Sequence, residues 1–192
     1  MAMKTSPKQL ILDIATRLYY AQGYHATGYN QILTAINVGQ ADVYQNQDSK
    51  TEIGLAYLRD ESEAWFKELD SLLAIQELPA EKLLTLFDYA EQFVQRPDGR
   101  GGRYLTLLTE IGEADPLMQA QVVNHKAELR TRCQRLAAAS LAPDAEDGRV
   151  HALADATYLL FEGAVIESSL YRDNWPVQAA KRAVRILIEN QA

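Results

Sequence analysis

The sequence predicts an all-helical protein, and three observations support this fold class. Hydrophobic residues make up 47% of the 192 residues, which is enough for a substantial core. Only 10 Gly and 6 Pro interrupt long stretches that are rich in the helix-forming residues Ala, Leu, Glu, Gln and Arg. Apolar residues recur at spacings of three and four, as one face of an α-helix requires. About nine helices are therefore expected, with no convincing strand.

The first three expected helices are short. Pro7 suits the first position of the first helix, and Gly23 ends this helix. Thr27 is expected to cap a second helix that ends near residue 36. A tight turn then leads into a third helix at residues 40–45. Two short helices joined by a tight turn are the layout of a helix-turn-helix, which places its second helix in the major groove of DNA.

Six further helices are expected after this segment. Asp48 or Ser49 caps the first of them, and Pro79 opens the second. The expected ranges are about 50–73, 79–93, 104–112, 117–141, 150–171 and 177–188. We therefore expect two domains, with a helix-turn-helix domain at residues 1–50 and a larger helical body at residues 51–192.

Charge and hydropathy restrict the location and the partners. The net charge is −7, whereas residues 1–52 contain four basic and four acidic residues and are neutral. Because cationic side chains supply most non-specific affinity for nucleic acid, weak non-specific binding with a shallow salt dependence is expected. No apolar run is long enough for a membrane span, and the N-terminus lacks the apolar region of a secretory signal. The sequence thus predicts a cytoplasmic protein without a membrane partner.

The chain lacks the sequence motifs of common enzymes. No Gly-x-Ser-x-Gly elbow, glycine-rich phosphate loop or His-Glu-x-x-His zinc motif occurs. The three histidines lie far apart at His25, His125 and His151, and the single cysteine is Cys133. Cys133 is expected to be a small buried apolar side chain rather than a redox sensor. We therefore expect neither enzymatic activity nor a metal or cofactor.

The order of these elements and many residues resemble the tetracycline-repressor (TetR) family of bacterial transcription regulators. Residues 102–116 resemble one branch of that family. The N-terminal residues that carry the resemblance are Ile11, Ala15, Leu18, Gly23, Tyr24, Thr27, Ile32, Val38, Tyr44, Ser49 and Lys50. The resemblance implies a homodimer, joined through the last two helices, that binds a palindromic double-stranded DNA operator as a repressor. It also implies a chamber for a small-molecule effector inside the long helices.

The resemblance and side-chain chemistry together predict the DNA contacts. Gln40, Gln45 and Asn46 can read adenine through paired hydrogen bonds, each worth about 1–3 kcal/mol of discrimination. Tyr44 and Lys50 resemble family residues that contact phosphate, and Lys50 is assisted there by the positive end of its helix dipole. Further backbone contacts are expected from Thr27, Gly28 and Tyr29 at the second helix.

The predicted recognition helix departs from the family pattern. Asn37 and Gly39 stand at positions where the family commonly has Gly and Ser or Pro, and no cation follows. Asp42 adds a negative charge, and Gln47 replaces an aromatic residue that packs this helix onto the next one. These departures support an alternative function, a dimer of this fold with weak or no DNA binding that acts as a small-molecule or protein-binding module.

Large apolar and amphipathic residues of the long helices are the candidates for the effector chamber, although each is also compatible with an ordinary core. They are Trp65, Tyr89, Phe93, Tyr104, Leu108, Ile111, Met118, Val122, His125, Tyr158, Phe161 and Glu162. Glu162 lies in an apolar run, where its carboxylate either meets a cationic ligand or forms a salt bridge. Small residues such as Gly163 and Ala179 in the last two helices allow the close helix packing of a four-helix dimer interface.

Overall fold

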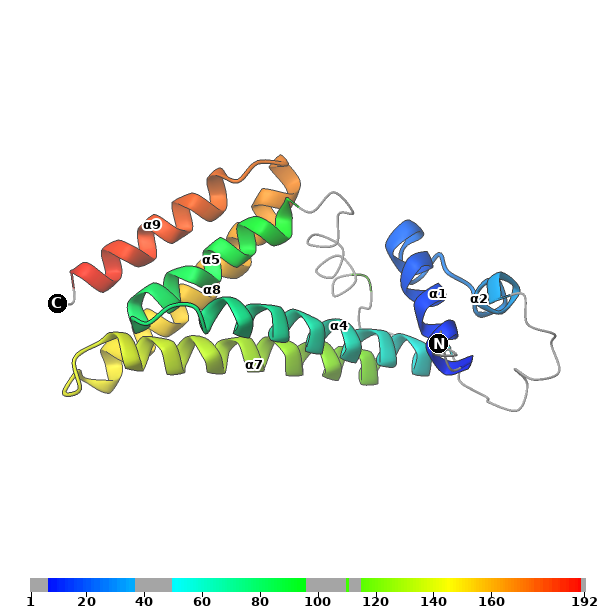
Figure 1. Cartoon of the computed structure of the whole chain (residues 1–192), viewed down its shortest axis with the longest axis horizontal. Coiled ribbons are helices and arrows are strands. Elements are labelled where there is room, and N and C mark those ends of the chain that lie inside the picture. The colour runs from blue at the N-terminus through cyan, green and yellow to red at the C-terminus, as the bar shows by residue number, and fades with distance from the viewer. Residues whose placement is uncertain (1–6, 37–49, 96–109, 111–114, 191–192) are drawn as a thin grey trace. The chain divides into compact units, whose positions relative to one another are not determined.

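The computed structural model describes residues 7–36, 50–95, 110 and 115–190, and these contain seven helices and no strand (Figure 1). The helices are α1 (Pro7–Gln22), α2 (Tyr29–Ile36), α4 (Lys50–Leu73), α5 (Pro79–Val94), α7 (Pro116–Ser140), α8 (Asp147–Tyr171) and α9 (Trp175–Glu189). The predicted all-helical class is confirmed. Two of the expected helices, at 40–45 and 104–112, lie outside the described residues, except for Glu110 in the second of them. The total of about nine helices is therefore not confirmed. No described helix is long and apolar enough to cross a membrane.

Contacts divide the chain into two compact units. Unit 1 comprises residues 1–63 and 106–123, and unit 2 comprises residues 64–105 and 124–192. The division runs through α4 and α7, whereas the sequence suggested a boundary at residue 50. The first turns of α4 group with the N-terminal helices because Tyr57 packs against residues of α1.

The core of unit 1 is rich in tyrosine. On α1, Ile11, Ala15 and Tyr19 are buried at a spacing of four residues, as the three- and four-residue spacing of apolar residues in the sequence predicts for one face of a helix. The Tyr19 ring lies 5.3 Å from the ring of Tyr24 and 5.3 Å from that of Tyr57. Such tilted and edge-on pairs are favourable beyond the area that they bury. These rings join α1, the turn after it and α4.

The start of α2 differs from the prediction. The carbonyl of Gly28 accepts the first helical hydrogen bonds, from the backbone N–H groups of Gln31 and Ile32. Thr27 does not cap the helix, because its side chain is completely buried and its hydroxyl donates to the Gly23 carbonyl at 2.7 Å. The hydroxyl also accepts a hydrogen bond from the Gln22 amide at 3.1 Å. Thr27 therefore closes the turn between α1 and α2.

The core of unit 2 is mainly aliphatic and phenylalanine-rich. Nearly the whole inner face of α5 is buried, and α5 packs against α8 and α9, which also pack against each other (Figure 1). The buried residues of α5 are Leu83, Leu84, Thr85, Leu86, Phe87, Tyr89, Ala90 and Phe93. At roughly 1.5–3 kcal/mol for each fully buried large side chain, this burial is the main stabilising term of unit 2.

Two helices of unit 2 begin earlier than the sequence suggested. α8 begins at Asp147 rather than near residue 150, because Glu146 has extended backbone angles and Asp147 complements the helix dipole in the first turn. α9 begins at Trp175 rather than at 177, since Pro176 needs no N–H partner in the first turn.

Candidate functional sites

Lys50, the predicted phosphate contact, is the first residue of α4 and lies against the turn that follows α1. Its ammonium nitrogen is 4.4 Å from the centre of the Tyr24 ring and 3.5 Å from the carbonyl oxygen of His25. Partial burial lowers the pKa of Lys50 below its ordinary value. Because an ammonium group has three N–H donors, two remain after the carbonyl contact when only the described residues are considered. Lys50 is thus oriented by Tyr24 and keeps donors for an anionic partner.

Glu110 holds the same turn. The backbone N–H of Tyr24 donates to the Glu110 carboxylate at 3.1 Å, and the His25 ring contacts the Glu110 carbonyl oxygen. Gly23 has a φ of +89°, and a Cβ at this position would lie 2.9 Å from a Glu110 carboxylate oxygen. Only glycine adopts this backbone conformation without strain. The turn therefore depends on Gly23 both for its conformation and for the approach of Glu110.

The start of α7 is tied to α4 within unit 1. The Thr51 hydroxyl donates to one carboxylate oxygen of Asp115 at 2.8 Å. The other oxygen accepts the backbone N–H groups of Leu117 and Met118, so Asp115 caps α7. A Cβ on Gly54 would lie 2.8 Å from the Met118 methyl group and 2.9 Å from the Tyr24 ring. The close packing of α4 against both neighbours therefore requires glycine at position 54.

The other predicted DNA contacts have different environments. Gly28 is exposed and Tyr29 is half-buried at the start of α2, whereas the buried Thr27 side chain offers no hydroxyl to a ligand. The backbone contacts expected from Thr27, Gly28 and Tyr29 stay a prediction. Outside the described residues lie Gln40, Tyr44, Gln45 and Asn46. Contacts by these four residues stay a prediction.

Trp65 is the centre of the aromatic cluster in unit 2. Its ring centre lies 5.0 Å from that of Tyr89, 5.2 Å from that of His125 and 6.1 Å from that of Phe161. The rings of Trp65, His125 and Phe161 border a cavity of about 20 Å³, which holds about one water molecule. The cavity is lined by Trp65, Phe93, His125, Lys126, Leu129, Phe161, Glu162 and Val165. Five of the predicted effector residues therefore line one cavity.

The cavity carries a polar edge. Lys126 and Glu162 form an ion pair there, with side chains that are 24% and 17% exposed. Burial, followed by the charge of Lys126, lowers the pKa of His125 to about 4, so its imidazole is neutral at pH 7. Glu162 thus forms a salt bridge, as one of its two predicted roles required. A cationic ligand would have to compete with Lys126 for this carboxylate.

The remaining effector candidates do not line this cavity. Tyr89 is buried beside Trp65, and its hydroxyl donates to the Trp65 carbonyl at 3.3 Å. Tyr158 is half-buried at the margin of the core. Met118 and Val122 belong to unit 1, where Met118 is buried against Gly54. Tyr104, Leu108 and Ile111 lie outside the described residues.

Three residues that line the cavity are absent from the predicted effector set, namely Lys126, Leu129 and Val165. Val165 lies one helical turn beyond the predicted Phe161, so the helical period could have identified it. In the sequence, Lys126 resembles an ordinary surface lysine. Only its ion pair with Glu162 of α8 identifies it as a residue of the cavity. Cys133 is buried, and burial raises the pKa of its thiol to about 12, which makes it an unreactive core residue.

Comparisons with known proteins identify relatives of both the sequence and the fold. No family model matches the chain. An uncharacterized helix-turn-helix type transcriptional regulator of Lactococcus lactis subsp. lactis is 32% identical over 83 residues, which span 43% of this chain and 42% of the relative. The chain thus covers less than half the length of this curated relative.

Among solved structures, a TetR-family transcriptional regulator from Streptomyces coelicolor matches with a TM-score of 0.83 at 19% identity, over 98% of this chain and 91% of the other. A protein from Saccharomonospora viridis, solved in complex with choline, matches with a TM-score of 0.76 at 17% identity, over 95% of each chain. At these identities, the matches establish a common fold.

Proposed function

We propose that this chain, which has the fold of the TetR family of transcriptional regulators, is a DNA-binding regulator whose affinity for an operator is controlled by a small molecule. The observation that carries this proposal is the agreement in fold along nearly the whole chain, from the N-terminal helices to α9. The partial sequence match to a helix-turn-helix type regulator supports it independently. In this proposal, unit 1 contacts DNA and unit 2 binds the effector.

The geometry around Lys50 supports a phosphate contact. Lys50 lies at the N-terminus of α4, where the helix dipole favours an anion, and Tyr24 restrains its flexible side chain. A restrained ammonium group loses less conformational entropy when it binds phosphate. We expect Lys50 to anchor one strand while residues 40–46 read the bases.

The aromatic cavity supports effector binding in unit 2. Ligand sites usually have volumes of roughly 300–1,000 Å³, so the rings around the small cavity must move apart to admit an effector. We propose a small organic cation as the first ligand class to test, because Trp65 and Phe161 offer aromatic faces and Glu162 offers a carboxylate. The choline bound to the S. viridis protein is consistent with this class.

An apolar stripe on α8 supports the proposed homodimer. Leu159, Ile166 and Leu170 are 66%, 52% and 73% exposed and follow one another at helical spacing. Gly163 lies within the stripe, and a Cβ there would meet no atom within 4 Å. A second copy of α8 could approach closely at this glycine. The exposed Ile186 of α9 adds to an interface related by a two-fold axis.

A population shift would link the effector to DNA. α4 contributes residues to both units, with Lys50 at its start and Trp65 in the aromatic cluster. An effector that binds one position of α4 more tightly than another lowers the population of the DNA-binding state. We propose that the free dimer represses its operator and that the effector releases it.

Selection of bound fragments from random and genomic DNA by the purified protein at low salt tests the proposal. Enrichment of a palindromic sequence is expected, and choline and related cations should reduce its binding in a gel-shift titration. Failure to enrich any sequence would instead favour the module without DNA binding.

A pair of lysine variants on α4 tests the phosphate contact that we propose for Lys50. Lys50→Ala should weaken operator binding about tenfold, as expected for a charge-assisted phosphate contact. Lys67→Ala removes an equal charge from an exposed position of the same helix and should leave the affinity unchanged. Equal losses in both variants would reject the specific contact at Lys50.

A further inference from the structure

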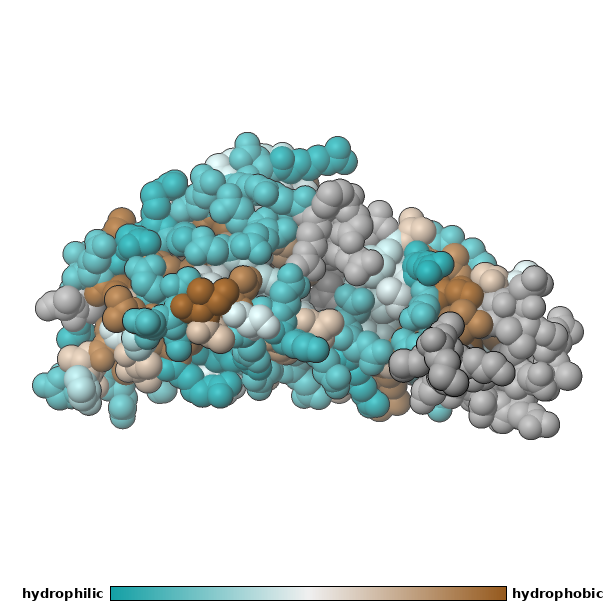
Figure 2. Space-filling view, viewed as in Figure 1, coloured by the Kyte–Doolittle hydropathy of each residue, from teal (hydrophilic) through white to brown (hydrophobic). Residues whose placement is uncertain are grey.

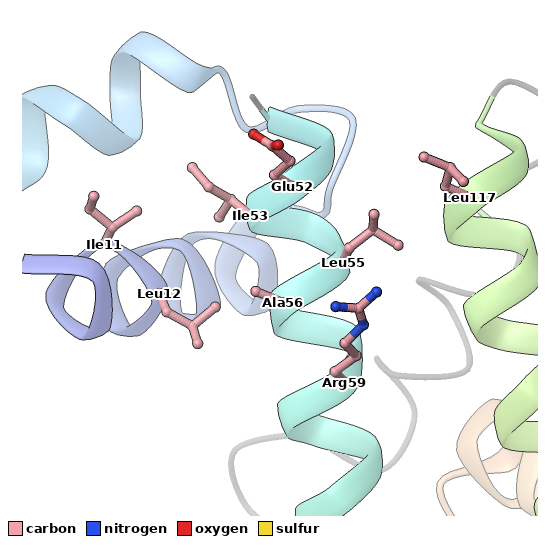
Figure 3. A pocket seen from close by; sticks show the side chains of 8 residues that line it. All are labelled: Ile11, Leu12, Glu52, Ile53, Leu55, Ala56, Arg59 and Leu117. Carbon is pink, nitrogen blue, oxygen red and sulfur yellow. The ribbon is translucent and has the colours of Figure 1, made fainter. Parts of the chain in front are cut away.

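A second concave surface lies within unit 1 and shares no residue with the aromatic cavity. It is a groove of about 380 Å³ along the first half of α4 (Figure 3). Its lining consists of Ile11, Leu12, Glu52, Ile53, Leu55, Ala56, Arg59 and Leu117. This volume falls within the range of small-molecule sites, roughly 300–1,000 Å³.

One face of α4 forms the floor of the groove. Glu52, Leu55, Ala56 and Arg59 recur at spacings of three, one and three residues, so they share one side of the helix. Figure 3 shows Ile11 and Leu12 of α1 on one side of α4 and Leu117 of α7 on the other. Arg59 follows Glu52 by seven positions, which is about 10 Å along the helix axis. The floor therefore has an apolar centre between two opposite charges.

The two charged ends differ in their availability. Arg59 is exposed, and no hydrogen bond or ion pair between described residues involves its guanidinium group. Glu52, at the other end, already has an interaction partner. A planar guanidinium can bind a carboxylate, sulfonate or phosphate with two parallel hydrogen bonds. The available charge is therefore cationic.

The apolar wall beside Arg59 is also exposed. Leu117 has 63% of its surface exposed, and Figure 3 places it across from Leu55 and Arg59. A bound apolar group would cover Leu117 and Leu55 and remove their surface from water. The groove is only about two helical turns long, so it fits a compact molecule rather than a partner helix.

We propose that this groove binds a small amphipathic anion whose acidic group pairs with Arg59 and whose apolar body lies over Leu55, Ala56 and Leu117. The carboxylate of Glu52 at the far end orients the ligand, because it repels the acidic group. The bound molecule contacts both α4 and α7. This site is additional to the proposed effector cavity and does not depend on it.

Two fluorescent probes that differ in one charged group test this proposal on the full chain without DNA. The anionic probe is 8-anilino-1-naphthalenesulfonate, and the neutral probe is N-phenyl-1-naphthylamine, which has the same rings without the sulfonate. The anionic probe should bind with one site per chain and more tightly than the neutral one. Its affinity should fall as salt is added, whereas that of the neutral probe should not.

Variants locate the site. Arg59→Gln should weaken the anionic probe about fivefold, the upper end for an ion pair near the surface, and leave the neutral probe unchanged. Ala56→Trp fills the apolar centre and should block both probes. Lys67→Gln removes a cation from an exposed position of α4 and should change neither affinity.

Circular dichroism and thermal melting verify the fold of each variant. If Ala56→Trp is unstable, the comparison of Arg59→Gln with Lys67→Gln still tests the proposal. An unchanged affinity of the anionic probe in Arg59→Gln overturns the proposal. So does its loss in Lys126→Gln, which would place the anion in the aromatic cavity. Neither result bears on operator binding, which the DNA selection tests separately.

Discussion

The two units of this chain are stabilised by different kinds of side chain. In unit 1, tyrosine rings meet around Tyr19, and polar groups such as Thr27, Glu110 and Asp115 tie the helix ends together. In unit 2, the largest buried side chains are mostly Leu and Phe, and polar contacts lie near its margin. Hydrogen bonds are directional, whereas burial of apolar surface is not. Small displacements of the helices should therefore destabilise unit 1 more than unit 2.

Figure 2 shows that one face of the molecule is mostly hydrophilic, with separate apolar patches. The cores of the two units lie beneath this surface and depend on their own packing. The stability of each core can therefore be tested separately. A substitution in the core of unit 2, a change of pH, and two substitutions in unit 1 should each alter the free energy of unfolding, in order from the largest effect to the smallest.

Removal of the Phe87 ring should have the largest effect. Phe87 is completely buried on α5, and its ring centre lies 6.1 Å from that of Phe161. Phe87→Ala should lower the free energy of unfolding by about 3–5 kcal/mol, because the surrounding core cannot close the cavity. Urea denaturation measures this loss. Ile75→Ala, at a position that is 73% exposed, is the control and should cost less than about 0.5 kcal/mol.

Acid should destabilise unit 2 through His125. The ordinary pKa of 6.5 applies to the unfolded chain, and burial lowers the pKa in the folded protein to about 4. As the pH falls from about 6.5 to about 4, the unfolded chain takes up a proton that the folded protein excludes. The free energy of unfolding should therefore fall across this window, by about 3 kcal/mol in total.

Urea denaturation from pH 7 to pH 4 measures this dependence. His125→Asn should show a flatter dependence than the unchanged protein, whereas His151→Asn, at an exposed position, should not differ. If the free energy of unfolding depends on pH equally in the unchanged protein and in His125→Asn, His125 is not the cause of the acid destabilisation.

Two tyrosines of unit 1 should respond in opposite directions. The Tyr20 hydroxyl donates to Glu61, so Tyr20→Phe should lower the free energy of unfolding by about 1 kcal/mol. The buried Tyr19 hydroxyl has no hydrogen-bond partner in the described part of the chain. Tyr19→Phe should therefore raise the free energy of unfolding by up to about 1 kcal/mol. A loss in both variants would mean that Tyr19 also has a polar partner.

The sequence predicted the long helices well because their signals are local. The spacing of apolar residues identified the buried face of α1, and Pro79 correctly marked the first residue of α5. The resemblance to the TetR family is confirmed for the fold. The cap at Thr27 was wrong because a threonine hydroxyl can equally bond to a carbonyl behind it. The sequence does not show whether the hydroxyl lies closer to a backbone N–H of the following helix or to the carbonyl of Gly23.

The site was harder to predict because it depends on contacts between distant residues. Periodicity indicates which side chains point inward, as for Trp65 and Phe161, but not where inward side chains leave a cavity. The pairing of Lys126 with Glu162 joins residues that are 36 positions apart. The groove beside Arg59 needs Leu117 of α7 as well as α4. Such sites arise from tertiary packing, which the local pattern does not contain.

Gly54 has a consequence for attempts to stabilise this protein. Replacing helical glycines by alanine usually gains up to about 1 kcal/mol, since alanine restricts the unfolded chain and favours the helix. At Gly54 the added methyl group would collide with Met118 and Tyr24, so the usual design rule reverses its sign there. A consensus or helix-propensity redesign of α4 should leave this one position untouched.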